Sequence, residues 1–65
     1  MVESLSEIER SILQKAVEKL NYVYMHGRGE SLTPDETTVF NYCKEKGLVV
    51  AVGPAPFGEI YEIRD

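Results

Sequence analysis

Cys43 and His26 are the two side chains whose types could combine into a nucleophile and its base. A thiol performs such chemistry only when a base can take its proton and hydrogen-bond donors can stabilise the oxyanion. Cys43 falls among the apolar positions of a predicted helix, where a cysteine behaves as a small hydrophobic residue. His26 falls in a predicted loop open to solvent. The sequence therefore predicts no enzyme, and catalysis through Cys43 is the weakest of three functional hypotheses.

Metal and cofactor sites are not indicated either. A structural zinc site needs four thiolate or imidazole ligands, and the sequence offers one Cys and one His. Gly27 and Gly29 do not fit a phosphate-binding loop, because no strand precedes them and the Gly-Lys-Ser/Thr ending is missing. We expect no catalytic residues, no metal ligands and no cofactor.

The charge and the cysteine count restrict the class of protein. Seven Lys and Arg against eleven Asp and Glu give a net charge of −4, which disfavours nucleic acid as a partner. A single cysteine fits a reducing cytoplasm better than secretion. The first residues are acidic and no apolar run approaches the ~18 residues of a membrane span. We expect a cytoplasmic protein that has no leader and no contact with a membrane.

A first helix is predicted over about residues 6–25. Ser6 and Glu9 have the spacing of a capping box. Apolar residues then recur at helical spacing over roughly half of the cylinder, wider than the ~100° that one packing surface needs. They are Leu5, Ile8, Ile12, Leu13, Ala16, Val17, Leu20, Val23 and Tyr24. Two interpretations remain open: the hairpin and the second helix cover the two sides, or one side is a dimer interface.

A loop at residues 26–32 separates this helix from a second helix, predicted over about residues 34–46. Thr33, Pro34 and Glu36 give the strongest local signal in the chain, with a cap, a proline at the first helical position and an acid at the third. Gly47 is placed to close the helix in a left-handed conformation.

A β-hairpin is predicted over about residues 48–63. An apolar, β-branched run is followed by a Pro/Gly loop at residues 53–58 and by an alternating segment. That loop would place Val50 opposite Tyr61 and Leu48 opposite Ile63, with Val49, Ala51, Ile60 and Glu62 on the other face. The predicted core is Leu20, Val39, Phe40, Leu48, Val50, Tyr61 and Ile63. The fold class expected is α+β, with two helices and a C-terminal hairpin (ααββ) in one domain, residues 1–65.

The second half of the chain resembles the end of a winged-helix domain. The resemblance covers about residues 33–65 and is carried by the run Cys43 to Val50, a Pro/Gly loop and the run Glu59 to Ile63. It implies a degenerate winged-helix-like fold and, as an alternative function, a DNA-binding transcriptional regulator. Its basic residues would have to gather on one face. They are Arg28, Lys44, Lys46 and Arg64.

Binding to another protein is the first hypothesis. Phe57 lies in a loop stiffened by Pro54 and Pro56, and a rigid aromatic residue loses little entropy on entering a partner's pocket. Phe57 could equally fold back as a lid over the hairpin. Tyr22 lies away from the main apolar arc of the first helix and is the other candidate contact. The expected partner-binding residues are therefore Phe57, Tyr22, Pro54 and Pro56.

We therefore expect a small regulatory or adaptor protein that binds a protein partner. The small size is also typical of proteins from compact genomes such as those of phages and plasmids. The wide apolar arc and the two-stranded sheet predict a homodimer, through the first helix rather than through the sheet edge.

Overall fold

The computed structural model describes residues 5–64. Two helices, α1 (Glu7–His26) and α2 (Pro34–Lys46), are followed by two antiparallel strands, β1 (Val49–Ala55) and β2 (Gly58–Ile63). The expected α+β class with the order ααββ is confirmed. The first helix begins and ends one residue later than predicted, so His26 is its last residue and does not belong to the loop.

Both helices have the capping residues that the sequence predicts. Ser6 and Thr33 accept hydrogen bonds from the backbone N–H groups of Glu9 and Glu36, and each glutamate accepts one from the N–H of its cap residue. Each helix closes on a left-handed glycine, with φ of +74° at Gly27 and of +77° at Gly47. A residue with a side chain would be strained in this conformation. The two capping boxes and the two glycines therefore define the four helix ends through residues close in sequence.

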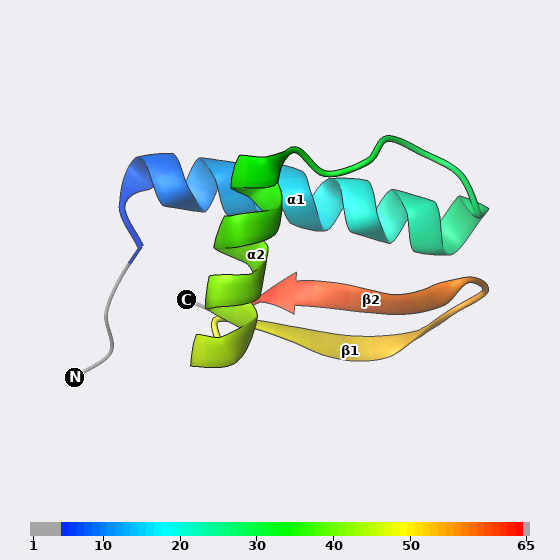
Figure 1. The fold of residues 1–65 in the computed structure, drawn as a ribbon. Coiled ribbons are helices and arrows are strands. Elements are labelled where there is room, and N and C mark those ends of the chain that lie inside the picture. Colours follow the sequence, from blue (N-terminus) through cyan, green and yellow to red (C-terminus); the bar gives the residue numbers. More distant parts are fainter. Residues whose placement is uncertain (1–4, 65) are drawn as a thin grey trace.

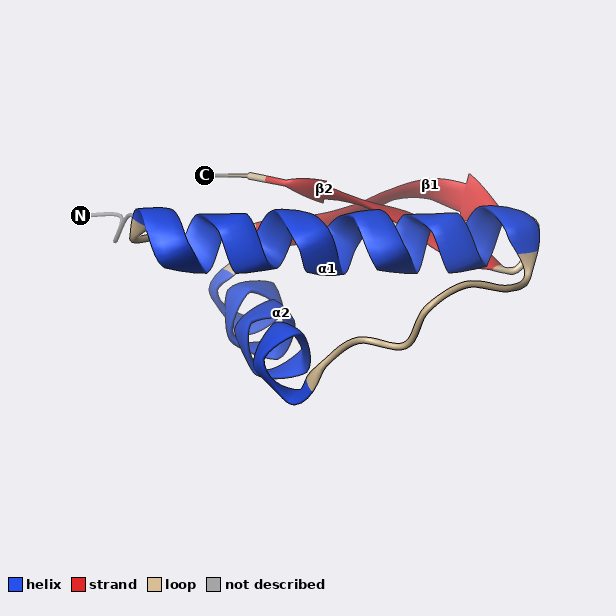
Figure 2. Cartoon of the chain, turned by 90° about the horizontal axis from the view of Figure 1, so that it is seen from above, coloured by secondary structure: helices blue, strands red, loops and turns tan. Residues whose placement is uncertain are grey.

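The second helix, α2, and the hairpin both pack against α1. Viewed from above, α2 lies on one side of α1 and the hairpin lies on the other (Figure 2). Within the hairpin, β2 is the strand that contacts α1, and β1 lies on the side away from it (Figure 1). The loop at residues 27–33 runs back along α1 to the start of α2 (Figure 2). The wide apolar arc of α1 is thus used on two sides within one chain.

The hairpin turn is shorter than the sequence predicts. It consists of Pro56 and Phe57 alone, and Ala55 pairs with Gly58 on either side of it. Pro54 lies inside β1, opposite Glu59, and not in a loop. A proline is compatible with an edge strand when its nitrogen faces away from the paired strand.

The predicted strand register is wrong by one residue. Val49 pairs with Ile63, Ala51 pairs with Tyr61, and the register shifts at a β-bulge between Ala51 and Gly53. The bulge adds Val52 to β1 without a partner on β2. Because of the shorter turn and the bulge, the side chains of β1 lie on the opposite faces of the sheet from those predicted, with Val49 in place of Val50 on the core face.

The core lies where both helices meet the beginning of β1. Phe40 and Leu48 are buried as predicted, and the predicted core residues Leu20, Val39, Tyr61 and Ile63 are half-buried against it. Val50 is wrongly predicted: it pairs with Glu62, and Val49 takes its place in the core with only 1% of its surface exposed. The other buried apolar residues are Leu5, Leu13, Ala16, Val17 and Cys43.

Candidate functional site: the end formed by α1 and the hairpin turn

The end of α1 and the hairpin turn pack through two aromatic rings that each cover a glycine. The ring of Phe57 lies on Gly27, where an added Cβ would be 2.8 Å from Cζ of the ring. In return, the ring of Tyr24 lies on Gly58, where an added Cβ would be 2.6 Å from Cδ1. The N–H of Phe57 also donates to the carbonyl of Tyr24, with N and O 2.9 Å apart. The turn is thereby held against the last turn of the helix.

Phe57 contributes both to this packing and to the surface. Its ring covers Gly27, yet 62% of the residue remains exposed. It is therefore not a lid over the hydrophobic core, and one part of the side chain faces solvent while its backbone is fixed. Pro56 precedes it in the turn and is exposed, and Pro54 is exposed in β1.

Tyr22 lies on the same end of the molecule. Its ring lies against that of His26 with centroids 4.4 Å apart and the ring planes tilted by 44°, and an added Cβ at Gly29 would be 3.1 Å from its Cδ1. Phe57 and Tyr22 therefore pack on two glycines only two positions apart in the loop. Tyr22 is 52% exposed.

Met25 is a third exposed apolar residue here, and the sequence did not identify it as a candidate contact. It lies in the last turn of α1 and is 48% exposed. We call Tyr22, Met25 and Phe57 together the aromatic end. The exposure of Met25 was not predictable from the sequence, because a methionine near a helix terminus is as compatible with the core as with the surface.

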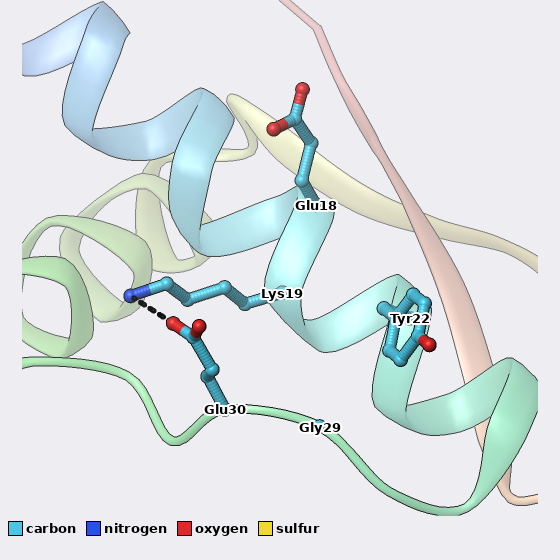
Figure 3. A pocket seen from close by; sticks show the side chains of 5 residues that line it. All are labelled: Glu18, Lys19, Tyr22, Gly29 and Glu30. Atoms are coloured by element: carbon cyan, nitrogen blue, oxygen red, sulfur yellow. Dashed lines mark ion pairs between the residues drawn. The ribbon is translucent and has the colours of Figure 1, made fainter.

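A hollow of about 450 Å³ lies beside the aromatic end, between α1 and the loop. Figure 3 shows Lys19 reaching toward Glu30 across it, whereas the carboxylate of Glu18 points away from them. Tyr22 and Gly29 complete the lining. A second hollow, of about 660 Å³, lies on α2 and is lined by Thr38, Asn41, Tyr42, Lys44 and Glu45.

Lys19 joins the two helices at the first hollow. Its Nζ donates to Oε1 of Glu36 at 2.8 Å and lies 3.8 Å from Oε2 of Glu30. Glu36 is only 6% exposed although it carries a charge. The hydrogen bond with Glu36 raises the pKa of Lys19, and the same bond, with the one from the N–H of Thr33, lowers the pKa of Glu36. The pair therefore stays ionised over a wide pH range.

Neither hollow brings together Cys43 and His26, the two side chains that the sequence identifies as a possible nucleophile and base. Cys43 is fully buried in the core and His26 lies on the surface against Tyr22, so the lining of neither hollow includes them. Within residues 5–64, no three His, Cys, Asp or Glu side chains are grouped so that they could hold a metal ion. No helix in this same range has the length and apolar character to cross a membrane.

Comparisons with other proteins leave the geometry as the basis for a functional proposal. No protein-family model matches the chain, and searches of curated proteins and of solved structures gave no significant match.

Proposed function

We propose that this chain is a small, non-enzymatic regulatory or adaptor protein that binds another protein through its aromatic end. The observation that carries the proposal is the exposure of Tyr22, Met25 and Phe57, between 48% and 62%, on one pre-formed end of the molecule. Apolar and aromatic side chains that are exposed on a rigid frame are typical anchors of protein interfaces.

Rigidity supports this interpretation. The backbone of Phe57 is fixed by the hydrogen bond to Tyr24, and its ring rests on Gly27. Tyr22 is held between His26 and Gly29. A partner would therefore order few additional rotamers on binding, and this entropy cost is a main cost of association.

Charge supports a protein partner over DNA. The first turn of α2 presents the exposed carboxylate of Asp35, and the hairpin turn consists of Pro56 and Phe57, neither of which is basic. A winged-helix protein would contact phosphates or bases with such segments, and carboxylates would repel the backbone of DNA. The single, buried Cys43 favours the cytoplasm as the compartment.

Affinity purification with matched variants tests the proposal. Wild type, Phe57→Ala, Tyr22→Ala and Ile8→Ala would each be cross-linked in a lysate of the source organism, and the captured proteins would be quantified. Ile8 is the control, because it is 75% exposed and lies at the other end of α1. We expect a protein captured by wild type and Ile8→Ala to be lost with Phe57→Ala and Tyr22→Ala. Equal capture by all four would contradict the proposal.

A titration with random duplex DNA tests the alternative. We expect no binding at low salt. Measurable binding that weakens steeply with salt would replace the proposal with the DNA-binding function.

A further inference from the structure

The outer edge of β2 is closed by a side chain of α1. Nδ2 of Asn21 donates to the carbonyl of Tyr61 at 3.1 Å, and the N–H of Tyr61 donates to Oδ1 of Asn21 at 2.9 Å. The amide thus binds Tyr61 as a neighbouring strand would. It also shows that the N–H and C=O of Tyr61 point away from β1.

The same geometry fixes the direction of the backbone groups of Ala51. Ala51 is the antiparallel partner of Tyr61, and the polar groups of two such residues point both toward or both away from each other. The N–H of Arg64 donates to the carbonyl of Leu48, so these two residues form a hydrogen-bonded pair. Hydrogen-bonded and non-hydrogen-bonded pairs alternate along an antiparallel ladder, so Val50 with Glu62 is also a hydrogen-bonded pair and Ala51 with Tyr61 is not. The N–H and C=O of Ala51 therefore point out from the free edge of β1.

No group within residues 5–64 binds these outward-pointing atoms of Ala51. Ala51 is exposed, as is the adjacent Val52 at 49%. Figure 1 shows β1 on the side of the hairpin away from α1; α2 crosses the beginning of β1, and no helix or strand is drawn along the outer edge of the rest of the strand. A strand edge of this kind is a template for pairing with another chain.

We propose that this edge pairs with the same edge of a second copy of the chain, antiparallel and centred on Ala51. Two Ala51 residues facing each other would exchange two N–H to O=C hydrogen bonds. In that register Val50 of each copy would lie opposite Val52 of the other, and cross-strand pairs of β-branched residues stabilise sheets.

The charge distribution favours a second copy as the occupant. The chain carries a net charge of −4, but Val49–Ala55 contains no charged residue. Two copies can therefore meet along β1 without placing carboxylates against each other. An edge that proteins protect from pairing commonly carries lysine, and β1 has none.

The assembly closes at two copies. Asn21 already occupies the outer edge of β2, so that the four-stranded sheet of a dimer cannot extend further. Beyond Val52 the pairing ends on either copy, because the bulge changes the course of the strand there and Pro54 has no N–H to donate. Because the contact is short, we expect a dissociation constant between roughly 1 μM and 1 mM.

This surface differs from the helix interface that the sequence predicts. Leu13, Ala16 and Val17 of α1 are buried within the chain, between α2 and the hairpin. Of the apolar arc toward the start of the helix, Ile8 remains exposed, at 75%. A single isoleucine offers less for a dimer than the backbone and valines of β1.

Amide hydrogen exchange of Ala51 and Val50 is the most direct test. The N–H of Val50 points to Glu62 and should be protected at every concentration, whereas that of Ala51 should become protected only as the protein concentration rises. Sedimentation equilibrium over the same range should show a mass rising from 7.4 kDa toward twice that value.

Three variants locate the interface. Ala51→Pro removes an N–H that the hairpin does not use, and Val52→Lys places a charge on the edge while leaving that N–H in place. We expect each to weaken association by about tenfold or more, and Ile8→Lys to leave it unchanged. A constant mass of 7.4 kDa, or exchange of Ala51 that is independent of concentration, would overturn the proposal. Loss of the dimer in Ile8→Lys alone would overturn it in favour of α1.

Discussion

Nζ of Lys19, in the middle of α1, lies 2.8 Å from Oε1 of Glu36 in the first turn of α2. The same carboxylate accepts the N–H of Thr33, so one side chain both caps α2 and attaches it to α1. Glu36 is buried, and removing its cation would leave a charge with little access to water.

We therefore expect Lys19→Met to lower the free energy of unfolding, because Glu36 would then be ionised without its partner. Lys15→Met is the matched control, one turn earlier on α1 at an exposed position. Urea denaturation of both variants at pH 7 measures the difference. Equal stability of the two variants would show that the ion pair contributes nothing beyond an exposed lysine.

Acid should destabilise the protein through the same carboxylate. The folded-state pKa of Glu36 lies below its ordinary value of 4.5, so its contribution is complete above pH 4.5 and is lost as pH falls through the lowered pKa. The pKa of Lys19 is raised above 10.5, so its contribution is complete below pH 10.5 and is lost as pH rises through the raised pKa.

The pH dependence can be measured by urea denaturation between pH 2 and pH 7. Glu36→Gln should be less stable than wild type at pH 7, and the difference should shrink below pH 4.5. A difference that does not change with pH would mean that the charge of Glu36 does not stabilise the fold.

Phe40 should be the most sensitive of the predicted core positions. It is buried and meets the ring of Tyr61 edge-on, with centroids 5.1 Å apart. Phe40→Ala should cost about 3 kcal/mol or more, a large part of the stability of so small a domain. Tyr42→Ala is the control, since Tyr42 lies on the same helix and is 40% exposed. A thermal melt of Phe40→Ala close to that of wild type would contradict the core assignment.

Local signals in the sequence were sufficient to predict both helices. Thr33, Pro34 and Glu36 define the start of α2, and Gly47 defines its end, because caps depend on residues only a few positions apart. The alternating segment at the C-terminus likewise predicted β2. The fold class follows from these elements and their order.

Long-range contacts were not predictable in the same way. The bulge at Val52 has no distinctive residue type, and without it the register cannot be derived from the loop alone. Glu36 was fully explained as a cap, and Lys19 lies 17 positions away from it. Lys19 lies next to Ala16 and Leu20 on the apolar side of the helix. This position was the one indication in the sequence that its side chain is partly buried.

Asn21 should be essential for the position of the hairpin. Asn21→Asp keeps the size and one acceptor but replaces the donor to the carbonyl of Tyr61 with a second acceptor. We expect a loss of about 1–3 kcal/mol at pH 7. The loss should become smaller in acid, because a protonated Asp can donate to that carbonyl. Urea denaturation of wild type and variant at pH 7 and pH 3 measures this; a difference that grows in acid would contradict the assignment.

Gly58 should tolerate no side chain because of Tyr24. An added Cβ would be 2.6 Å from Cδ1 and 2.8 Å from Cγ of that ring, close to the rigid base of the side chain. Gly53 is the matched control, since it also lies in the hairpin, has no positive φ and has nothing within 4 Å of an added Cβ. The two glycines therefore differ mainly in the presence of the ring.

Gly58→Ala should lower the free energy of unfolding by about 1–3 kcal/mol, because the Tyr24 ring and the hairpin turn must move apart. Gly53→Ala should be neutral or stabilising by up to about 1 kcal/mol, because alanine restricts the unfolded chain. In a Tyr24→Ala background the two glycine substitutions should have similar effects, since the ring that distinguishes them is gone. Urea denaturation of the six proteins completes the cycle. If Gly58→Ala remained as costly without Tyr24, the contact between ring and glycine would not be what holds the turn against α1.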